Sequence, residues 1–211
     1  MRWSAFPVLI LLALGLSGCA TMTQGECLSG NWLRVGYQDG AAGHPPSRLG
    51  NHEAACAAHG VGVDPQAYFD GRERGLVEYC TPWGGFNAGR NGRTYHGVCA
   101  YESEGAFLTG YTDGRHVHEA DQYASRARSD VSSRESRIRR LQRDIDRLRG
   151  RMESAESSDD RKALAAELQA LRGELRQAER SLVQARREHD LAERELQRVR
   201  YLLEPRYHGG W

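Results

Sequence analysis

The sequence lacks a hydrophobic run long enough to cross a membrane. Its main apolar stretch lies between Phe6 and Leu16, whereas a membrane-spanning helix needs about 20 apolar residues. A short apolar stretch this close to the start of a chain is typical of a signal peptide. The sequence therefore predicts export rather than a spanning helix.

An excess of charge is also missing. The chain has 29 basic and 28 acidic residues, for a formal net charge of +1 at pH 7. This balance argues against the strongly basic class of nucleic-acid-binding proteins, and we expect no nucleic-acid partner. Lysine is almost absent, since Lys162 is the one lysine among the basic residues, which we interpret as the mark of a GC-rich genome.

No motif of a known catalytic chemistry is present. The sequence offers no nucleophile motif, no pair of carboxylates at a fixed spacing and no phosphate-binding loop. We therefore expect a protein that is not an enzyme, with no catalytic residues, no cofactor and no metal.

A lipoprotein signal closes the apolar stretch. Leu16-Ser17-Gly18-Cys19 is a lipobox, in which small residues precede a cysteine that receives a diacylglycerol. We expect residues 1–18 to be removed and Cys19 to carry lipid, whose anchoring strength grows by about 0.8 kcal/mol per buried CH₂. Ala20 stands where an aspartate would favour retention in the inner membrane, so we expect the outer membrane, facing the periplasm. The alternatives are an uncleaved signal anchor and an ordinary secretory signal.

Four more cysteines follow: Cys27, Cys56, Cys80 and Cys99. In an oxidising compartment an even set predicts two disulfides, for which three connectivities exist. We predict Cys27–Cys56 and Cys80–Cys99. The first pair meets if helices near 31–43 and 47–59 are antiparallel, and the second pair flanks the next helix and loop. The alternative is zinc, because His52 and Cys56 lie one helical turn apart with His59 nearby, but zinc requires four ligands.

Glycine recurs after aromatic residues at helical spacing. Short helices are expected near 31–43, 47–59, 65–79 and 83–92, and the pattern reads Tyr37-Gly40-Gly43, Tyr68-Gly71-Gly75, Phe86-Gly89-Gly92 and Phe107-Gly110-Gly114. Glycine inside a helix costs about 1 kcal/mol relative to alanine, so close helix packing or a ligand near the backbone must compensate. Hairpin turns are a third interpretation. If a ligand such as a glycan or peptidoglycan fragment binds here, the candidate residues are Asp39, His52, Arg72 and Tyr95.

A longer set of spaced residues includes the cysteines, the aromatic residues and the glycines: Cys27, Trp32, Gly36-Tyr37-Gln38-Asp39-Gly40, Arg48, His52, Cys56, Asp64, Tyr68, Gly71-Arg72, Gly75-Leu76, Tyr79-Cys80-Thr81-Pro82, Gly85-Phe86, Gly89, Gly92, Tyr95 and Gly97-Val98-Cys99. Over roughly residues 27–114 this set resembles a bacterial lipoprotein family called domain of unknown function 2799. The resemblance implies a small exported domain with paired cysteines and no known activity.

A heptad pattern begins at Val117 and predicts a coiled coil. A polar segment at 154–160 divides it into two runs, so we predict an antiparallel hairpin with its turn there. Leu148 should then face Leu168, and Leu141 should face Leu175. The alternative is one long helix that pairs with another chain. Arg134 and His189 are polar seam positions, which often set register.

Together these features predict an all-α protein. The expected parts are a signal peptide (1–18), a lipid-anchored linker (19–26), a disulfide-stapled helical domain (27–116), a coiled-coil hairpin (117–205) and a frayed end (206–211). We expect an envelope lipoprotein whose hairpin is a spacer or docking arm. Its partners would be the membrane, through lipid on Cys19, and another envelope protein or a second copy of the chain.

Overall fold

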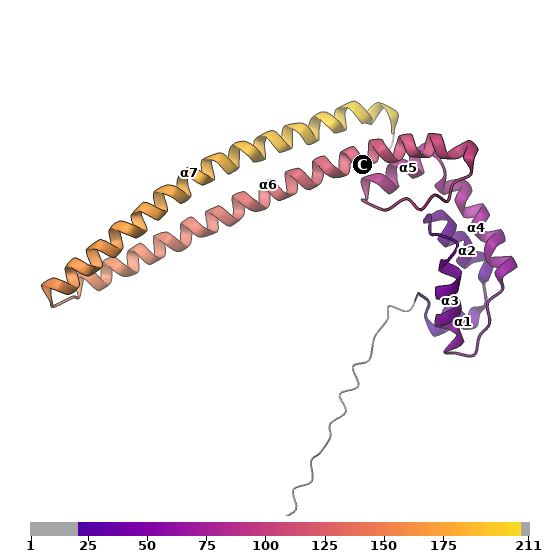
Figure 1. The fold of residues 1–211 in the computed structure, drawn as a ribbon, viewed down its shortest axis with the longest axis horizontal. Coiled ribbons are helices and arrows are strands. Elements are labelled where there is room, and N and C mark those ends of the chain that lie inside the picture. The colour runs from indigo at the N-terminus through magenta and orange to yellow at the C-terminus, as the bar shows by residue number, and fades with distance from the viewer. Residues whose placement is uncertain (1–20, 208–211) are drawn as a thin grey trace, which may run out of the picture. The chain divides into compact units, whose positions relative to one another are not determined.

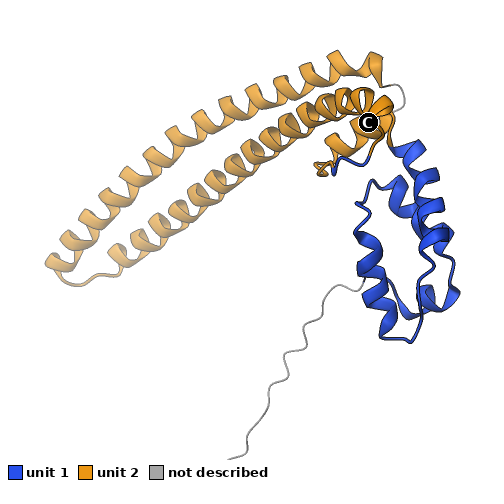
Figure 2. Ribbon diagram, turned by 45° about the vertical axis from the view of Figure 1, so that its right-hand side comes forward, with its two compact units in different colours: residues 1–79, 96–98 blue, residues 80–95, 99–211 orange. Residues whose placement is uncertain are grey.

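The computed structural model describes residues 21–207, which form helices and no strand. They divide into two compact units (Figures 1 and 2): residues up to Tyr79 with His96–Val98, and residues Cys80–Tyr95 with those from Cys99 onward. The predicted all-α class is confirmed. The lipobox and Cys19 lie outside the described residues, as does the segment 208–211.

The first unit contains four helices: α1 (Gln24–Ser29), α2 (Trp32–Ala41), α3 (Arg48–Ala57) and α4 (Pro65–Tyr79). The last three lie within two residues of the predicted ranges. Local hydrogen bonds begin each of α1, α2 and α4, because the side chains of Thr23, Asn31 and Asp64 accept from backbone N–H groups of the first turn. Helix α1 was not predicted, although Thr23 and Glu26 form the reciprocal capping box that marks a helix start.

Helices α2 and α4 pack in parallel, with the glycines of each helix against the backbone of the other. A Cβ atom added to Gly36 or Gly40 would overlap the carbonyl of Tyr68 or Arg72 on α4. The same overlap occurs at Gly71 and Gly75 against α2. The closest backbone packing of α2 is therefore with α4. Helix α3 contacts α2 through side chains, because Asp39 accepts from Arg48 and His52 while Trp32 shares a buried cluster with Cys56. These contacts run in the antiparallel order on which the Cys27–Cys56 prediction depended.

The second unit repeats this arrangement with α5 (Pro82–Arg90) and the first part of α6 (Tyr101–Glu153). Gly85 and Gly89 meet the backbone of α6, and Gly110 and Gly114 meet that of α5. Residues 36–43 (GYQDGAAG) correspond to residues 85–92 (GFNAGRNG), and both segments end in a left-handed glycine, Gly43 with φ 72° and Gly92 with φ 68°. We call residues 21–79, built around α2 and α4, the first module, and Cys80–Tyr95 with residues 99–118, built around α5 and the start of α6, the second module.

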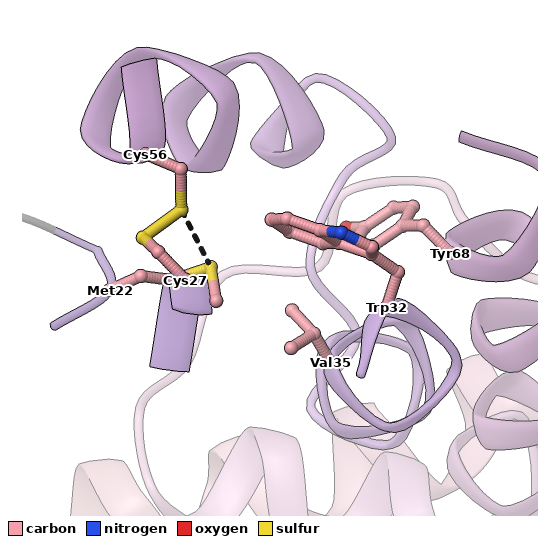
Figure 3. Packing of buried hydrophobic residues seen from close by; sticks show 6 residues of the cluster. All are labelled: Met22, Cys27, Trp32, Val35, Cys56 and Tyr68. Atoms are coloured by element: carbon pink, nitrogen blue, oxygen red, sulfur yellow. Dashed lines mark hydrogen bonds between the residues drawn. A yellow bond between two sulfur atoms is a disulfide. The ribbon is translucent and has the colours of Figure 1, made fainter. Parts of the chain in front are cut away.

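Each unit contains one disulfide. Cys27 is bonded to Cys56 with a Cα–Cα distance of 5.4 Å, and Cys80 to Cys99 with 5.5 Å. This is the connectivity expected from the sequence. The first disulfide is fully buried beside Met22 and Trp32 (Figure 3), so it belongs to the core of the first unit.

From Val117 onward α6 continues as one arm of a hairpin, and α7 (Ser158–Leu203) returns along it. The predicted hairpin is confirmed, with its turn at residues 154–157. Leu148 and Leu168 share one buried cluster, and Ala124 and Ala192 share another. The expected domain boundary at 116–117 lies inside α6, so no break in the backbone marks it.

The two polar residues at seam positions, Arg134 and His189, have different contacts. Arg134 turns along its own helix to Asp130, with Nε 2.7 Å from the carboxylate. His189 lies 3.5 Å from Glu193, which also receives Arg128 from the opposite helix. Arg134 is therefore ion-paired on its own helix, whereas the buried Nε2 of His189 has no hydrogen-bond partner among the described residues.

The end of the described chain is docked rather than frayed. A short 3₁₀ helix, η1 (Glu204–Arg206), follows α7. The ring of Tyr207 then stacks on Phe86 with centroids 4.0 Å apart, and its hydroxyl donates to Asp113 over 2.8 Å. The expectation of a frayed end from 206 is wrong for Arg206 and Tyr207, because this aromatic contact fastens the returning arm to the second module.

Candidate functional site

A buried polar cluster lies at the centre of the first module, around the carboxylate of Asp39 on α2. One carboxylate oxygen, Oδ2, accepts from His52 Nε2 at 2.7 Å and from the hydroxyl of Tyr68 at 2.8 Å. The other oxygen, Oδ1, accepts from Arg48 Nε at 3.1 Å. Asp39 is 7% exposed and His52 is 2% exposed. Three donors from α3 and α4 thus replace the water that this carboxylate has lost.

His52 links this cluster to Thr21, which precedes α1. Since a carboxylate can only accept, Nε2 of the imidazole carries the hydrogen that faces Asp39. The other ring nitrogen, Nδ1, shares a hydrogen bond with the hydroxyl of Thr21 over 2.9 Å. Both ring nitrogens are satisfied, so the orientation of the imidazole is fixed from two sides.

Tyr68 closes the cluster from α4. It is fully buried, and its ring packs edge-on against that of His52 with centroids 6.1 Å apart. Burial, followed by the hydrogen bond to Asp39, raises the pKa of Tyr68 well above its usual range. Tyr68 therefore remains a neutral donor throughout the physiological pH range.

Arg72 lies beside the cluster on α4 but serves a different contact. Its Nη2 donates to the carbonyl oxygen of His44 over 2.9 Å and so ties α4 to the end of α2. Among the described residues its buried Nε has no hydrogen-bond partner. In the second module Tyr111 occupies the corresponding position and donates to the carbonyl of Arg93 over 2.8 Å. The role of this position is therefore a shared helix-end contact.

Of the four candidate ligand-binding residues, the structure brings three together in the first unit: Asp39, His52 and Arg72. Tyr95 belongs to the second unit, where its hydroxyl donates to Glu104 and accepts from the N–H of Cys99. Sequence reasoning missed Arg48, Tyr68 and Thr21 as members of the cluster. Nothing in their local pattern indicates it, because they come from three separate segments.

The row Thr21–His52–Asp39 has the order of hydroxyl, imidazole and carboxylate used in acyl transfer. Burial and saturation argue against that use here. His52 is enclosed, and Asp39 already neutralises Arg48. The arrangement holds three segments of chain together and leaves no free base at a surface.

The zinc alternative and the ligand interpretation of the glycines both meet an obstacle. Cys56 is bonded to Cys27, so its sulfur cannot serve as a thiolate ligand. Within residues 21–207, no group of histidine, cysteine and carboxylate side chains is arranged to hold a metal ion. The recurring helical glycines Gly40, Gly71, Gly75, Gly89, Gly110 and Gly114 face the partner helix, so their bare backbone is already covered.

An open groove lies where the two arms begin, inside the second unit. It has a volume of about 460 Å³ and is lined by apolar side chains of both helices, among them Ala120, Tyr123, Val199 and Leu202. Tyr123 and Leu202 are exposed.

Among helices of the described part, none combines the length and the apolar character that a membrane crossing demands.

These features define a class: an all-α protein with two disulfide-bonded modules, each built around a glycine-packed helix pair, and a coiled-coil arm. Residues 31–116 match the model of a family described as a protein of unknown function, DUF2799. This segment is therefore assigned to that family, and the match spans both glycine-packed helix pairs but not the arm. No curated protein and no solved structure shows significant similarity to the chain.

Proposed function

We propose that this protein is a non-enzymatic lipoprotein of the bacterial envelope, in which lipid on Cys19 holds the disulfide-stapled part at a membrane and the arm meets another envelope protein. The observation that carries the proposal is the arm itself. It is a hairpin about 55 Å long, at 1.5 Å per residue, with a closed apolar seam. Such a rod spans distance and offers surface, but it contains no enclosed chamber for chemistry.

The pairing of the arm favours a different protein over a second copy as the partner. The apolar seam is used within the chain. Ion pairs cross between the helices on its flanks, including Arg128–Glu193 at 2.9 Å and Arg186–Glu135 at 2.7 Å. A second hairpin would find no free seam to pair with, so a partner must use the outer faces or the groove at the base.

The lipid anchor is supported by sequence and by compartment. Leu16-Ser17-Gly18-Cys19 is a lipobox, and two disulfides suit an oxidising space outside the cytoplasm. Ala20 after the cysteine favours the outer membrane, with the protein facing the periplasm.

Labelling cells with an alkyne fatty acid tests the anchor. The wild-type protein should carry the label and float with membranes, and Cys19→Ala should do neither. Trp83→Phe serves as the control that keeps Cys19 and should label normally. Equal labelling of wild type and Cys19→Ala would contradict the proposal.

Site-specific photocrosslinking in intact cells tests the arm. A crosslinking amino acid replaces exposed Arg140 on the outer arm or Tyr123 at the groove, and exposed Glu73 on α4 serves as the comparison position. We expect an adduct with another envelope protein from the arm or groove and none from Glu73. Adducts between two copies would make the protein its own partner. Adducts from Glu73 alone would assign the contact to the first module and remove the role of the arm.

A further inference from the structure

The second module serves as an internal control for the polar cluster of the first. At the position of Asp39 it has Ala88, and at that of Tyr68 it has Phe107. Both replacements are buried, and the same glycine contacts form around them. Parallel packing of two glycine-faced helices therefore requires no buried carboxylate. In the first unit the cluster additionally holds α3, through Arg48 and His52, and the segment before α1, through Thr21.

The contact with the segment before α1 involves residues 21 and 22. Through His52 the cluster holds the hydroxyl of Thr21. Met22 is 6% exposed and packs against the disulfide, with its Sδ 3.9 Å from Cys56 Sγ (Figure 3). The next residue, Thr23, begins α1 through its capping box with Glu26. A segment expected to be a linker, 19–26, is thus part of the fold from Thr21 onward.

We propose that the first module is a binding site for the chain's own segment directly after the lipobox cysteine. The His52–Asp39 pair recognises the hydroxyl of Thr21, and the apolar surface of the Cys27–Cys56 disulfide and Trp32 receives the side chain of Met22. The ligand class is a short peptide with a hydroxyl residue followed by a long apolar residue.

The consequence for the membrane rests on the proposed lipidation. From Cys19 to Thr21 the chain is two residues long, which spans on the order of 7 Å when extended. Lipid and fold are then joined without a free tether, and the first unit is held against the bilayer surface. In a protein with a loose linker of residues 19–26, the same unit would move freely around its anchor.

Protease release from the membrane tests this site in the full-length lipidated protein. Thermolysin cleaves before apolar residues, so it can cut at Met22 only when this segment leaves its site. Wild type in isolated membranes should resist release. Thr21→Val keeps the shape of the side chain but loses the hydroxyl, and release should be about 5-fold faster, the equilibrium effect of one net hydrogen bond. His52→Gln should be released at least as fast as Thr21→Val.

Thr109→Val is the matched control, because the hydroxyl of Thr109 bonds only the carbonyl of Gly105 on its own helix. It should behave as wild type. Release of wild type as rapid as that of Thr21→Val, or equal rates for Thr21→Val and Thr109→Val, would overturn the inference.

Hydrogen exchange separates this inference from the proposed lipidation. In a chain that begins at residue 19 and carries Cys19→Ala, the hydrogen-bonded backbone amides of Thr23, Glu26 and Cys27 should exchange slowly, and Thr21→Val should accelerate them by a similar factor. Protection there with no fatty-acid label in cells would leave the site intact and refute the lipid anchor. Rapid exchange in the unaltered segment would refute the site itself.

Discussion

Asp39 shows how strongly one residue depends on its surroundings. Its carboxylate is stable inside the first module because three donors converge on it. Removing the carboxylate leaves those donors inside the protein without an acceptor, which costs more than the hydrogen bonds contribute on their own. The second module reaches the same packing with apolar residues at the corresponding positions.

We expect Asp39→Ala to lower the free energy of unfolding by about 3 kcal/mol, because His52 and Arg48 then lose their buried charged partner. Tyr68→Phe made in that background should recover part of the loss, because it removes one orphaned hydroxyl and reproduces Phe107. Urea unfolding of both single variants and the double variant measures this coupling. Additive losses would mean that the two side chains act independently.

The stability that Tyr207 contributes to the fold should depend on pH. Burial, followed by its hydrogen bond to Asp113, raises the pKa of Tyr207 to about 12. An unfolded tyrosine titrates near pH 10, so the folded state favours the protonated phenol. The stabilisation is fully present below pH 10 and is lost as the pH rises through about 12. Phenolate absorbance of wild type minus that of Tyr207→Phe should show one group titrating near 12. A difference curve centred near 10 would show that this tyrosine is not docked.

At the scale of the helix, the glycines fall into two kinds that the sequence does not distinguish. Gly71 and Gly110 lie where a Cβ would overlap the carbonyl of a neighbouring helix. Gly105 and Gly150 are also inside α6, but nothing lies within 4 Å of their Cβ positions. The first kind permits close packing, whereas the second only weakens a helix.

Substitution by alanine should therefore have opposite signs at the two kinds of position. Gly110→Ala forces α5 and α6 apart and should destabilise by about 1–3 kcal/mol or more, as overpacking does. Gly105→Ala should stabilise by about 0.5–1 kcal/mol through helix propensity alone. Thermal unfolding followed by circular dichroism compares them. The same sign at both sites would refute the packing assignment.

On the scale of the whole chain, the arm depends on a single internal seam. Leu168 lies in the buried cluster with Ile145 and Leu148. Leu168→Asp should melt the arm and leave both disulfide-bonded modules folded, because a charge without a partner cannot be buried there. Ala166→Asp, on the exposed face of the same helix, is the matched control and should be close to wild type. Loss of arm helicity in both variants would argue against this seam.

Cysteines placed at positions 141 and 175 test whether the hairpin forms within one chain. They should crosslink intramolecularly, at a rate that does not depend on protein concentration, because Leu141 and the partly buried Leu175 both belong to the seam. A concentration-dependent dimer would instead indicate one long helix paired with a second chain.

The sequence by itself determined α2 to α5, the arm and its turn, because heptad spacing, caps and polar breaks act within a few residues of one another. It left three connectivities open for the four cysteines, and the structure contains the predicted one. Only tertiary structure decided that α2 pairs with α4, that Tyr207 docks on Phe86 and that Thr21 reaches His52. Those contacts join segments far apart in the chain. Their choice depends on which surfaces fit in space, and local pattern does not encode that.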